Sequence, residues 1–497
     1  MWRDLGITKH DWDRTPQAVR TVLLALEHQV RLMGIRFTAY EKQTADFRQQ
    51  VAQVDDLKAE IAELRERLGQ NSSNSSKPPS SDPPSYKAKP AAEAKERKRG
   101  AQPGHPGKAR TLKPEAEVDQ VIDFKPVSCK QCGRPLGGTD THPERHQVSE
   151  VPSVPVILTE YRRHTLSCQD CGIKTRAEWR AEMPRGSFGP RAQALIAYLT
   201  GRLGLSHRDA AEAMQVLHGL EMGLGSIASI QRRVSEALAG TVEQARQFVQ
   251  QQRAQHVDET GWREGGRQKW LWVTATRDVT VFHLLSGRSR KDAQEVISRD
   301  AKGIITTDRY WSYNWLTARR RQICWAHLAR DFQALVDRGG ESAQVGQSLL
   351  EQVKRLFVLW HQVRDNTLSR AEFQRKVKPL QQRVRTLLQV GSQSAYSKTR
   401  HTCANILKAA QSLWTFVRAE GVEPTNNAAE RGLRRAVLWR RTSFGTQSES
   451  GSQFVERILT AVQTLRQQER DVLAYLTDAC HHVLVKEEAE GLIPDTS

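Results

Sequence analysis

The spacing of hydrophobic residues first becomes regular in residues 47–68, within an N-terminal region (1–69) that is helical in character. From Val54 on, apolar residues recur at gaps of three and four, and charged residues fill most other positions. This spacing predicts a helix with a heptad seam. The seam consists of Val54, Leu57, Ile61, Leu64 and Leu68. Because it is short, two interpretations stay open: a helix packed on its own domain, or a coiled coil that joins protomers.

The regular spacing ends in a polar segment at residues 70–110. Its first part reads Gln-Asn-Ser-Ser-Asn-Ser-Ser-Lys-Pro-Pro, almost without apolar residues. Such a composition cannot bury a core, which predicts a disordered linker. The linker becomes basic between Lys95 and Arg99. It fits either a flexible cationic strap along a phosphate backbone or a solvated tether.

The middle of the chain contains a series of strand-like runs, two of which lead to an aspartate. Asp258 follows a short apolar rise, and Asp308 follows Gly-Ile-Ile-Thr-Thr. Two runs between them, 270–276 and 279–285, are rich in β-branched and aromatic residues, and residues 289–298 read as a helix. If the first and fourth strands are parallel neighbours, the two carboxylates meet at one edge of the sheet. That arrangement would make a divalent-metal site.

A fifth strand and a long helical stretch are predicted after Asp308. The strand lies in Gln-Ile-Cys just before Trp325, and the helix after it carries His327 and Arg330 one turn apart on the same face. This pair could approach a bound phosphate, or it could be a buried histidine and a surface arginine. Residues from about 339 to 420 then form a charged helical insertion.

The helix that begins near Asn427 carries a further acidic residue, Glu430. With Asn427 as N-cap, Glu430 takes the capping-box position and can also pair with Arg434. The alternative is a third carboxylate that completes the two aspartates. The arginines that follow would lie along DNA phosphates. They are Arg431, Arg434, Arg435, Arg440 and Arg441.

Residues 189–250 are helical with glycine-rich breaks. One helix follows Ser206 as its N-cap, and a second begins near Gly225. The two could form a DNA-binding helix-turn-helix, or they could pack beside the strand-rich part, because the gap between them is long for that motif. Residues 453–476 read as a terminal amphipathic helix pair.

The composition of the chain indicates that it binds an anionic partner. The chain carries 75 Lys and Arg against 56 Asp and Glu, a formal net charge of +19, and the basic residues are clustered, which favours nucleic acid over solubility alone. The length implies about three domains. No apolar run approaches the roughly 20 residues of a membrane span, and none resembles a signal peptide. A cytoplasmic protein, nucleoid-associated when bound to DNA, is expected.

Four of the seven cysteines form two Cys-x-x-Cys pairs, Cys129 with Cys132 and Cys168 with Cys171. Together they offer four thiolates to one tetrahedral Zn²⁺, and strand-like residues 151–166 would form the hairpin of a zinc ribbon within residues 111–180. Unpaired core thiols are the alternative. A four-cysteine shell leaves no open position for chemistry, so this zinc would be structural and would supply folding free energy on the order of 10 kcal/mol.

Seven motifs, in order, resemble transposases of the insertion-sequence 66 family over about residues 68–476. The motifs are Gly69-Gln-Asn-Ser-Ser-Asn-Ser-Ser-Lys-Pro-Pro79, Gln102-Pro-Gly-His105, the two cysteine pairs, His256-Val-Asp-Glu-Thr260, Asp308-Arg-Tyr310, Cys324-Trp-Ala-His327 and Asn426-Asn-Ala-Ala-Glu-Arg431. Seven motifs in the right order are far more specific than any one of them.

The resemblance implies a multidomain α/β protein, with a ribonuclease-H-like catalytic domain and its helical insertion in residues 251–480, preceded by the coiled-coil segment and the zinc ribbon. It implies that Asp258, Asp308 and Glu430 form an acidic triad holding Mg²⁺ or Mn²⁺, two ions roughly 4 Å apart, for DNA cleavage and strand transfer. The implied partners are double-stranded DNA of the element's terminal repeats and of the target, a second copy of the chain, and accessory proteins of the same element. Glu259 points to the other face of its strand and is not expected to be a ligand.

Two other functions fit the same residues. One is a zinc-containing DNA-binding regulator with an inactive catalytic unit, and the other is a nuclease of the same fold that stops after hydrolysis. The presence of all three acidic residues argues against the regulator. Joining of a cleaved 3′ end to a second DNA distinguishes a transposase from a nuclease.

Overall fold

The computed structural model of the protein describes residues 6–71, 73–75, 111–180, 183–184, 186–485 and 491–494. The basic stretch of the linker and its Gln-Pro-Gly-His motif lie outside the described residues. Within the part described, no helix is both long enough and apolar enough to cross a membrane.

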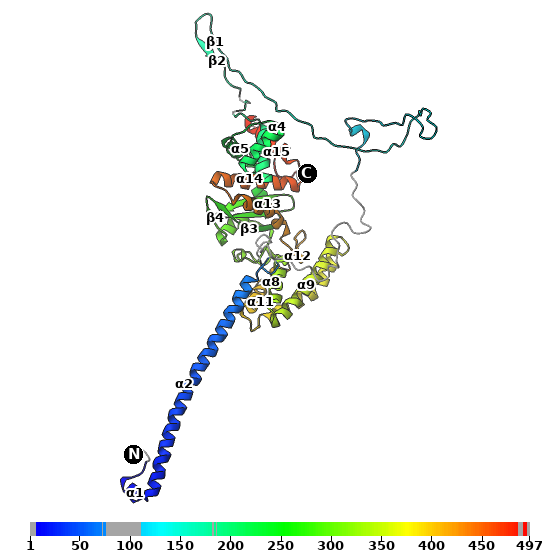
Figure 1. Ribbon diagram of the computed structural model, residues 1–497. Coiled ribbons are helices and arrows are strands. Elements are labelled where there is room, and N and C mark those ends of the chain that lie inside the picture. The colour runs from blue at the N-terminus through cyan, green and yellow to red at the C-terminus, as the bar shows by residue number, and fades with distance from the viewer. Residues whose placement is uncertain are drawn as a thin grey trace.

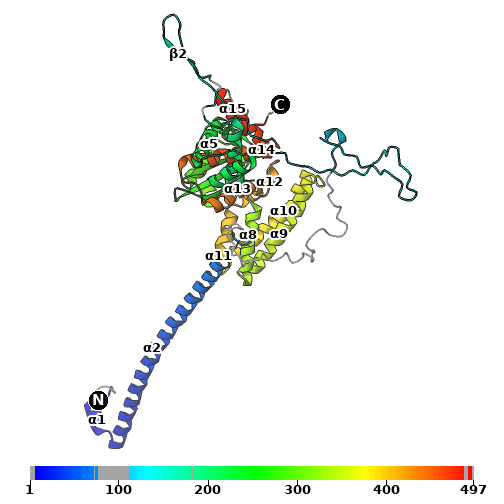
Figure 2. The same ribbon diagram turned by 45° about the horizontal axis from the view of Figure 1, so that its top comes forward.

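The N-terminal region is a short helix, α1 (Lys9–Arg14), followed by one very long helix, α2 (Gln17–Leu68). Helix α2 projects away from the rest of the molecule, and both views show this (Figures 1 and 2). All five residues of the predicted seam, from Val54 to Leu68, are therefore exposed. The helix is confirmed, but the interpretation that its seam packs on its own domain is wrong.

Residues 111–180 contain little regular structure. A single helical turn, η2 (Glu115–Glu117), precedes a two-stranded antiparallel sheet of β1 (Thr165–Ser167) and β2 (Lys174–Arg176). The predicted strand over residues 151–166 is wrong except at its last two residues. Its large apolar side chains are exposed, and Ile157 and Leu158 almost fully so, which leaves little packing to hold that stretch extended. The pairing instead follows the tight turn around the second cysteine pair.

Five helical segments follow, and they share one core with the last two helices of the chain. The five are α3 (Pro190–Ala197), the π-helical η3 (Tyr198–Leu203), α4 (His207–His218), α5 (Leu224–Ala237) and α6 (Ala239–Gln251). The last two are α14 (Glu449–Gln467) and α15 (Val472–Val485).

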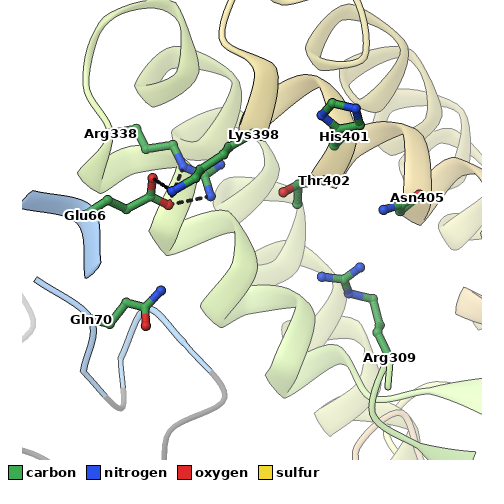
Figure 3. Close-up of a pocket in the computed structure, with 8 residues that line it drawn as sticks. All are labelled: Glu66, Gln70, Arg309, Arg338, Lys398, His401, Thr402 and Asn405. Carbon is green, nitrogen blue, oxygen red and sulfur yellow. Dashed lines mark hydrogen bonds and ion pairs between the residues drawn. The ribbon is translucent and has the colours of Figure 1, made fainter. Parts of the chain in front are cut away.

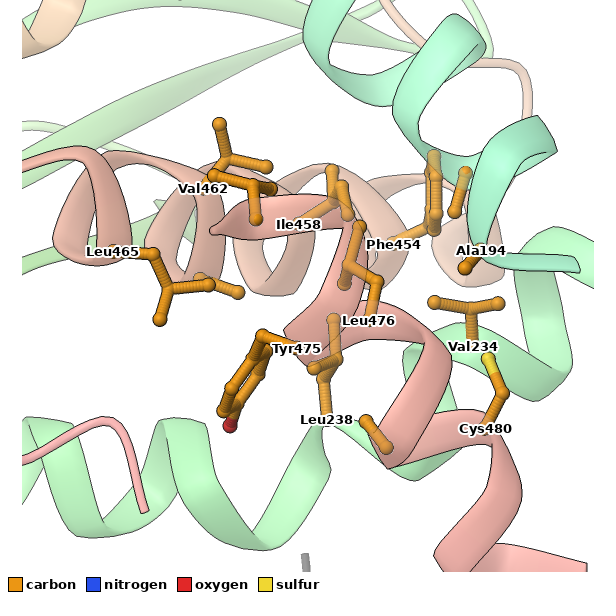
Figure 4. Packing of buried hydrophobic residues seen from close by; sticks show 14 of the residues in the cluster. Ala194, Val234, Leu238, Phe454, Ile458, Val462, Leu465, Tyr475, Leu476 and Cys480 are labelled. Atoms are coloured by element: carbon orange, nitrogen blue, oxygen red, sulfur yellow. The ribbon is translucent and has the colours of Figure 1, made fainter. Parts of the chain in front are cut away.

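Figure 4 shows how this shared core is built: Val234 of α5 packs with Ile458 of α14 and Leu476 of α15. The N-cap prediction at Ser206 is confirmed, with a complete capping box to Asp209. Because α5 is packed against α3, α14 and α15, the structure supports the packing interpretation of these helices.

A five-stranded mixed sheet forms the centre of the chain, in the order β5-β4-β3-β6-β7. Its strands are β3 (Ala254–Glu264), β4 (Arg267–Ala275), β5 (Thr280–Leu285), β6 (Ile304–Thr307) and β7 (Arg321–Ile323). Strand β3 is antiparallel to β4 and parallel to β6. Helix α7 (Arg290–Ile297) connects the antiparallel to the parallel part. The predicted element order, and the parallel pairing of the first and fourth strands, are confirmed.

One boundary prediction in the sheet is wrong. Asp258 does not end its strand, because β3 continues to Glu264 along its hairpin partner β4. The parallel pairing of β3 with β6 stops earlier, at His256 opposite Thr306. Asp258 therefore lies inside a strand but just beyond the parallel part, at the level where β6 has ended.

The two faces of the sheet are covered by different helices. Val273 packs with Leu433 of α13 (Asn427–Ser443), whereas the neighbouring Trp272 packs with Val296 of α7 on the opposite face. Strand residues alternate between faces, so Val257, which packs with Trp272, leaves Asp258 on the α13 face.

The predicted helical insertion is also confirmed as helical, and its aromatic residues Trp360, Phe373 and Phe416 belong to a core that it shares with α8 and the end of the sheet at β7. Its elements follow helix α8 (Trp325–Asp337), and the chain then returns to α13. They are α9 (Gly340–Arg364), α10 (Arg370–Gly391), α11 (Ser397–Lys408), η5 (Ala410–Leu413) and α12 (Thr415–Arg418).

Candidate active site

Asp308 is held at the end of β6 by its own backbone contacts. The backbone N–H of Tyr310 donates a hydrogen bond to the Asp308 Oδ1 at 2.9 Å. The buried guanidinium of Arg321 donates to the Asp308 carbonyl at 2.8 Å and to the Thr307 hydroxyl at 3.1 Å. These contacts bind the turn after β6 to strand β7, so the direction in which Asp308 leaves the sheet is fixed.

Glu430 lies in the first turns of α13, but its position relative to the N-cap differs from the one that the sequence predicts. The N-cap is Asn426, one residue earlier than predicted, and the backbone N–H of Glu430 donates to the Asn426 carbonyl at 3.1 Å. The Asn426 side chain makes no capping bond and instead donates to the carbonyl of Val257, 2.8 Å away on β3. The capping-box interpretation is therefore wrong, because the helix begins one residue earlier than predicted and Glu430 does not occupy the third helical position.

The Asn426 contact joins the two halves of the site. It links the start of α13 to the residue directly before Asp258, and Asn426 itself is completely buried. The side chain that follows one turn later, Glu430, is thereby held on the face of the sheet that carries Asp258.

The three carboxylates influence one another. Burial raises the pKa of Asp258 well above its usual value, and the negative charges of Glu259, Asp308 and Glu430 raise it further. The Oε1 of Glu430 is buried without a hydrogen-bond partner in the described part of the chain. A half-buried carboxylate surrounded by negative charge, beside a carboxylate oxygen without a donor, fits the ligand preference of a hard divalent cation.

A second group of residues, from the β7–α8 junction, surrounds Glu430. His327 Nδ1 lies 3.6 Å from one carboxylate oxygen of Glu430, and Arg330 Nη2 lies 3.7 Å from the other. His327 and Arg330 also face each other at 3.3 Å. The sequence indicated that these two share a helix face, but it did not indicate that they converge on Glu430.

Cys324 completes this group and was missed as a site residue. Among the residues described, one set of three His, Cys, Asp or Glu side chains has its ligand atoms within 4.8 Å of one another: Cys324, His327 and Glu430. Burial raises the pKa of the Cys324 thiol to about 12, and its sulfur accepts the backbone N–H of Asn426 at 3.1 Å. A protonated thiol is a poor metal ligand. With its proton bound, Cys324 therefore acts through its contact with Asn426, which positions the start of α13. The Cys-x-x-His spacing of Cys324 and His327 was the sequence signal that could have identified Cys324 as a site residue.

Glu259 lies on the opposite face, as predicted. The hydroxyl of Tyr313 donates to it at 2.5 Å, and Arg288 approaches it at 4.0 Å while packed between the rings of Trp270 and Tyr310. Burial, then the charge of Asp308, raises the pKa of Glu259 to about 7. Its carboxylate is therefore satisfied by contacts away from Asp258.

The predicted DNA-contacting arginines of α13 divide into two groups. Arg440 bonds the Thr260 hydroxyl at 2.9 Å and the Gly261 carbonyl, so it fastens α13 to β3. Arg441 is exposed at the end of the helix. The other three line one groove together with Arg202 and Arg466. They are Arg431, Arg434 and Arg435.

The two cysteine pairs form matching turns. The N–H of Gly133 donates to the Cys129 carbonyl at 2.9 Å, and that of Gly172 donates to the Cys168 carbonyl at 3.0 Å. Backbone N–H groups within each turn lower the pKa of Cys129 and of Cys168, which favours the thiolate form that zinc requires.

The structure does not bring the four thiols together, since among the described residues they do not form a group within the reach of one ion. In Figure 1 the β1–β2 hairpin lies far from the cyan segment around residue 130. Each pair is preformed, and the single site that the sequence predicts is not assembled in this arrangement.

Comparison with known proteins identifies the family of this chain. A family model described as "Transposase IS66 family" matches residues 185–454, which is more than half of the chain and contains the sheet, α13 and the insertion. The chain belongs to this family of transposases. A second model, "Family of unknown function (DUF6444)", matches residues 26–111.

Two curated relatives come from Sinorhizobium fredii (strain NBRC 101917 / NGR234). Uncharacterized protein y4hP is 25% identical over 403 residues, covering 73% of this chain and 72% of the relative. Uncharacterized protein y4qI is 25% identical over 254 residues, covering 45% of this chain and 46% of the relative. Their names state no activity.

Proposed function

We propose that this protein cleaves DNA at the ends of an insertion sequence and transfers the cleaved strand to target DNA, with Asp258, Asp308 and Glu430 as catalytic residues. The observation that carries the proposal is that β3 and β6, which lead to Asp258 and Asp308, are parallel neighbours, and that α13, which carries Glu430, covers the face of Asp258. Within the part of the chain that the structure describes, the oxygens of these three carboxylates are not all within 4.8 Å of one another. The negative charges of Asp308 and Glu430 both act on Asp258, which supports the proposal that the three belong to one site.

The strand arrangement supports a ribonuclease-H-like catalytic domain. Three antiparallel strands, β3 to β5, are extended by two parallel strands, β6 and β7. Two of the carboxylates lie on the neighbouring parallel strands at the centre, and the third comes from a helix on the same face. The insertion between β7 and α13 packs against α8 and the β7 edge of the sheet, so it extends this arrangement without interrupting the strand order.

The chain's own residues would divide the work as follows. Asp258, Asp308 and Glu430 would hold Mg²⁺ or Mn²⁺, which when bound supplies activation of the attacking oxygen and stabilisation of the leaving oxygen. His327 and Arg330 orient Glu430 from the side of α8. The arginines of α13 would hold DNA phosphates so that the scissile phosphorus lies in front of the attacking oxygen.

The reaction would proceed by two in-line displacements. Water attacks the phosphorus at the element's end, the bond to the 3′ oxygen breaks, and that oxygen takes up a proton to leave a free 3′-hydroxyl. This hydroxyl then loses its proton, attacks a phosphodiester of the target and displaces the target's own 3′ oxygen. No covalent bond to the protein forms.

Two further parts of the proposal concern the regions outside the sheet. The cysteine pairs Cys129–Cys132 and Cys168–Cys171 would share one structural Zn²⁺ when the two turns come together. Helix α2 would join two copies of the chain through its exposed seam. The DNA partners would be the terminal repeats and the target, with accessory proteins of the same element.

A cleavage and strand-transfer assay tests the proposal. DNA from the flanks of the gene is incubated with Mg²⁺ and either wild type, Asp308→Asn or Glu430→Gln. The exposed Glu423→Gln, a few residues before α13, is the matched control. We expect joined products with wild type and control, and a loss of at least about 10²-fold in both site variants.

Other results of this assay would contradict the proposal, and each would indicate a different function or a different ligand. Cleaved but never joined DNA would indicate a nuclease. DNA binding by wild type without cleavage would favour the regulator. Activity that survives Glu430→Gln would mean that another residue is the third ligand.

A further inference from the structure

A basic groove next to the proposed catalytic carboxylates is built from three segments distant in sequence. Five arginines line it: Arg202 from η3, Arg431, Arg434 and Arg435 from α13, and Arg466 from α14. The groove has a volume of about 520 Å³, and no acidic side chain lines it. Its floor is apolar, formed in part by Phe282, Leu459 and Val462. Five positive charges thus face one another without a carboxylate in the lining.

We propose that this groove binds the phosphate backbone of the DNA strand that leads to the carboxylates, and that Arg202 and Arg466 are phosphate contacts. The inference rests on the proposed function for the direction of the strand, but not for the phosphate chemistry. Guanidinium groups bind phosphate oxygens with two parallel hydrogen bonds, and an apolar floor strengthens such contacts by excluding water.

The position of the groove supports a strand and not a small anion. Helix α13, which supplies Arg431 and Arg434 to the groove, also carries Glu430, so the groove and a proposed catalytic carboxylate share one helix. From Arg431 to Leu438 the helix advances about 10 Å at 1.5 Å per residue. Phosphates of one strand advance about 3.4 Å each along the axis of a duplex, so a helix face of this length spans more than one phosphate.

The positive charges are held close together at a cost that an anion would relieve. Burial lowers the pKa of Arg202, and the neighbouring charges of Arg466 and Arg435 lower it further. The Nε of Arg435 is buried without a hydrogen-bond partner among the described residues. In a folded protein such groups normally have partners, which indicates that the partner here is a ligand.

The backbone makes specific room for this arrangement. A Cβ on Gly204 would lie 2.9 Å from Arg435 Nη2, and Gly204 has a φ of +73° that other residues rarely adopt. Arg202 belongs to a π-helical turn, a rare conformation that is frequent at functional sites. The missing side chain at Gly204 and the π-helical turn therefore both help to position the arginines of the groove.

The test measures DNA affinity against salt concentration, with a duplex of random sequence and no added Mg²⁺ or Mn²⁺. Each lost phosphate contact reduces the slope of log K against log salt by about 0.9. We expect the double variant R202Q/R466Q to reduce the slope by about 1.8, since two contacts are lost. The exposed Arg383→Gln, on helix α10 of the insertion, is the matched control and should leave the slope unchanged.

Two further measurements keep the result interpretable. The charge-conserving double variant R202K/R466K should retain most of the slope, and thermal unfolding should show that R202Q/R466Q is folded. An unchanged slope in folded R202Q/R466Q would overturn the inference even if wild type joins DNA. A reduced slope in a protein that never cleaves would support the groove while the proposed transposition fails. Competition by inorganic phosphate as strong as that by DNA would also overturn it.

Discussion

At the residue scale, the most consequential contact is the hydrogen bond from Asn426 to the carbonyl of Val257. It connects residues 169 positions apart and places the first turn of α13 over the strand that carries Asp258. The sulfur of Cys324 accepts the backbone N–H of the same asparagine. Neither partner is a proposed ligand, yet both determine where Glu430 lies.

Replacing Asn426 by alanine is expected to destabilise the fold by about 1–3 kcal/mol, because the buried Val257 carbonyl loses its donor. Strand transfer should fall as well, since Glu430 is no longer held. The adjacent and exposed Asn427→Ala should change stability by less than about 0.5 kcal/mol. Chemical denaturation of both variants measures the difference. Equal effects would show that Asn427, and not Asn426, stabilises the helix start.

At the element scale, the end of helix α2 is fastened to the insertion by one carboxylate. Figure 3 shows Glu66 between Arg338 and Lys398, with ion-pair distances of 3.0 Å to each. Burial alone would raise the pKa of Glu66, but hydrogen bonds from Lys398 and the charge of Arg338 outweigh it, so the pKa is lowered from 4.5. Helix α2 and the insertion are thereby coupled.

This coupling is expected to depend on pH. Because the docked state lowers the pKa of Glu66, its stabilisation is fully present above pH 4.5 and is lost as the pH falls through the lowered value. Exposed pairs contribute at most about 1 kcal/mol, so protection near residues 64–71 should fall up to about fivefold. Hydrogen exchange, corrected for intrinsic rates, measures this.

A glutamine at position 66 provides the comparison for the pH experiment. Glu66→Gln should show low protection at every pH, whereas Glu41→Gln, exposed farther along the same helix, should behave as wild type. Protection that is equal in wild type and Glu66→Gln would show that the ion pairs do not hold α2 to the insertion.

At the scale of the whole molecule, α2 presents an apolar stripe much longer than the predicted seam. Exposed hydrophobic residues spaced by three or four positions continue back through Phe37 and Met33 to Val19. An apolar stripe of this length along an unpartnered helix is the pattern of a coiled coil. A second copy of the chain supplies an identical stripe.

The expected consequence is self-association through α2. Replacing Leu57 and Leu64 together by aspartate puts charges into the seam and should convert an oligomer into a monomer, measured by light scattering after size exclusion. Gln49→Asp, an exposed position outside the stripe, should leave the mass unchanged. A monomeric wild type at micromolar concentration would contradict the prediction.

The sequence by itself determined what depends on neighbouring residues. Heptad spacing predicts α2, the capping serine predicts α4, and β-branched runs predict the strands of the sheet and their order. These features follow from periodicity and local hydrogen bonding, which a few consecutive residues specify. The division into domains and the acidic triad remain predictions of the same kind.

Only the tertiary structure decided which distant groups meet. It moved Asp258 from the end of a strand to its interior, used Asn426 to join α13 to β3, and placed His327 and Arg330 against Glu430. It also brought Arg202 and Arg466 beside the arginines of α13. The physical reason is that such contacts depend on how whole elements pack, and packing is selected by the summed burial of many side chains far apart in the chain.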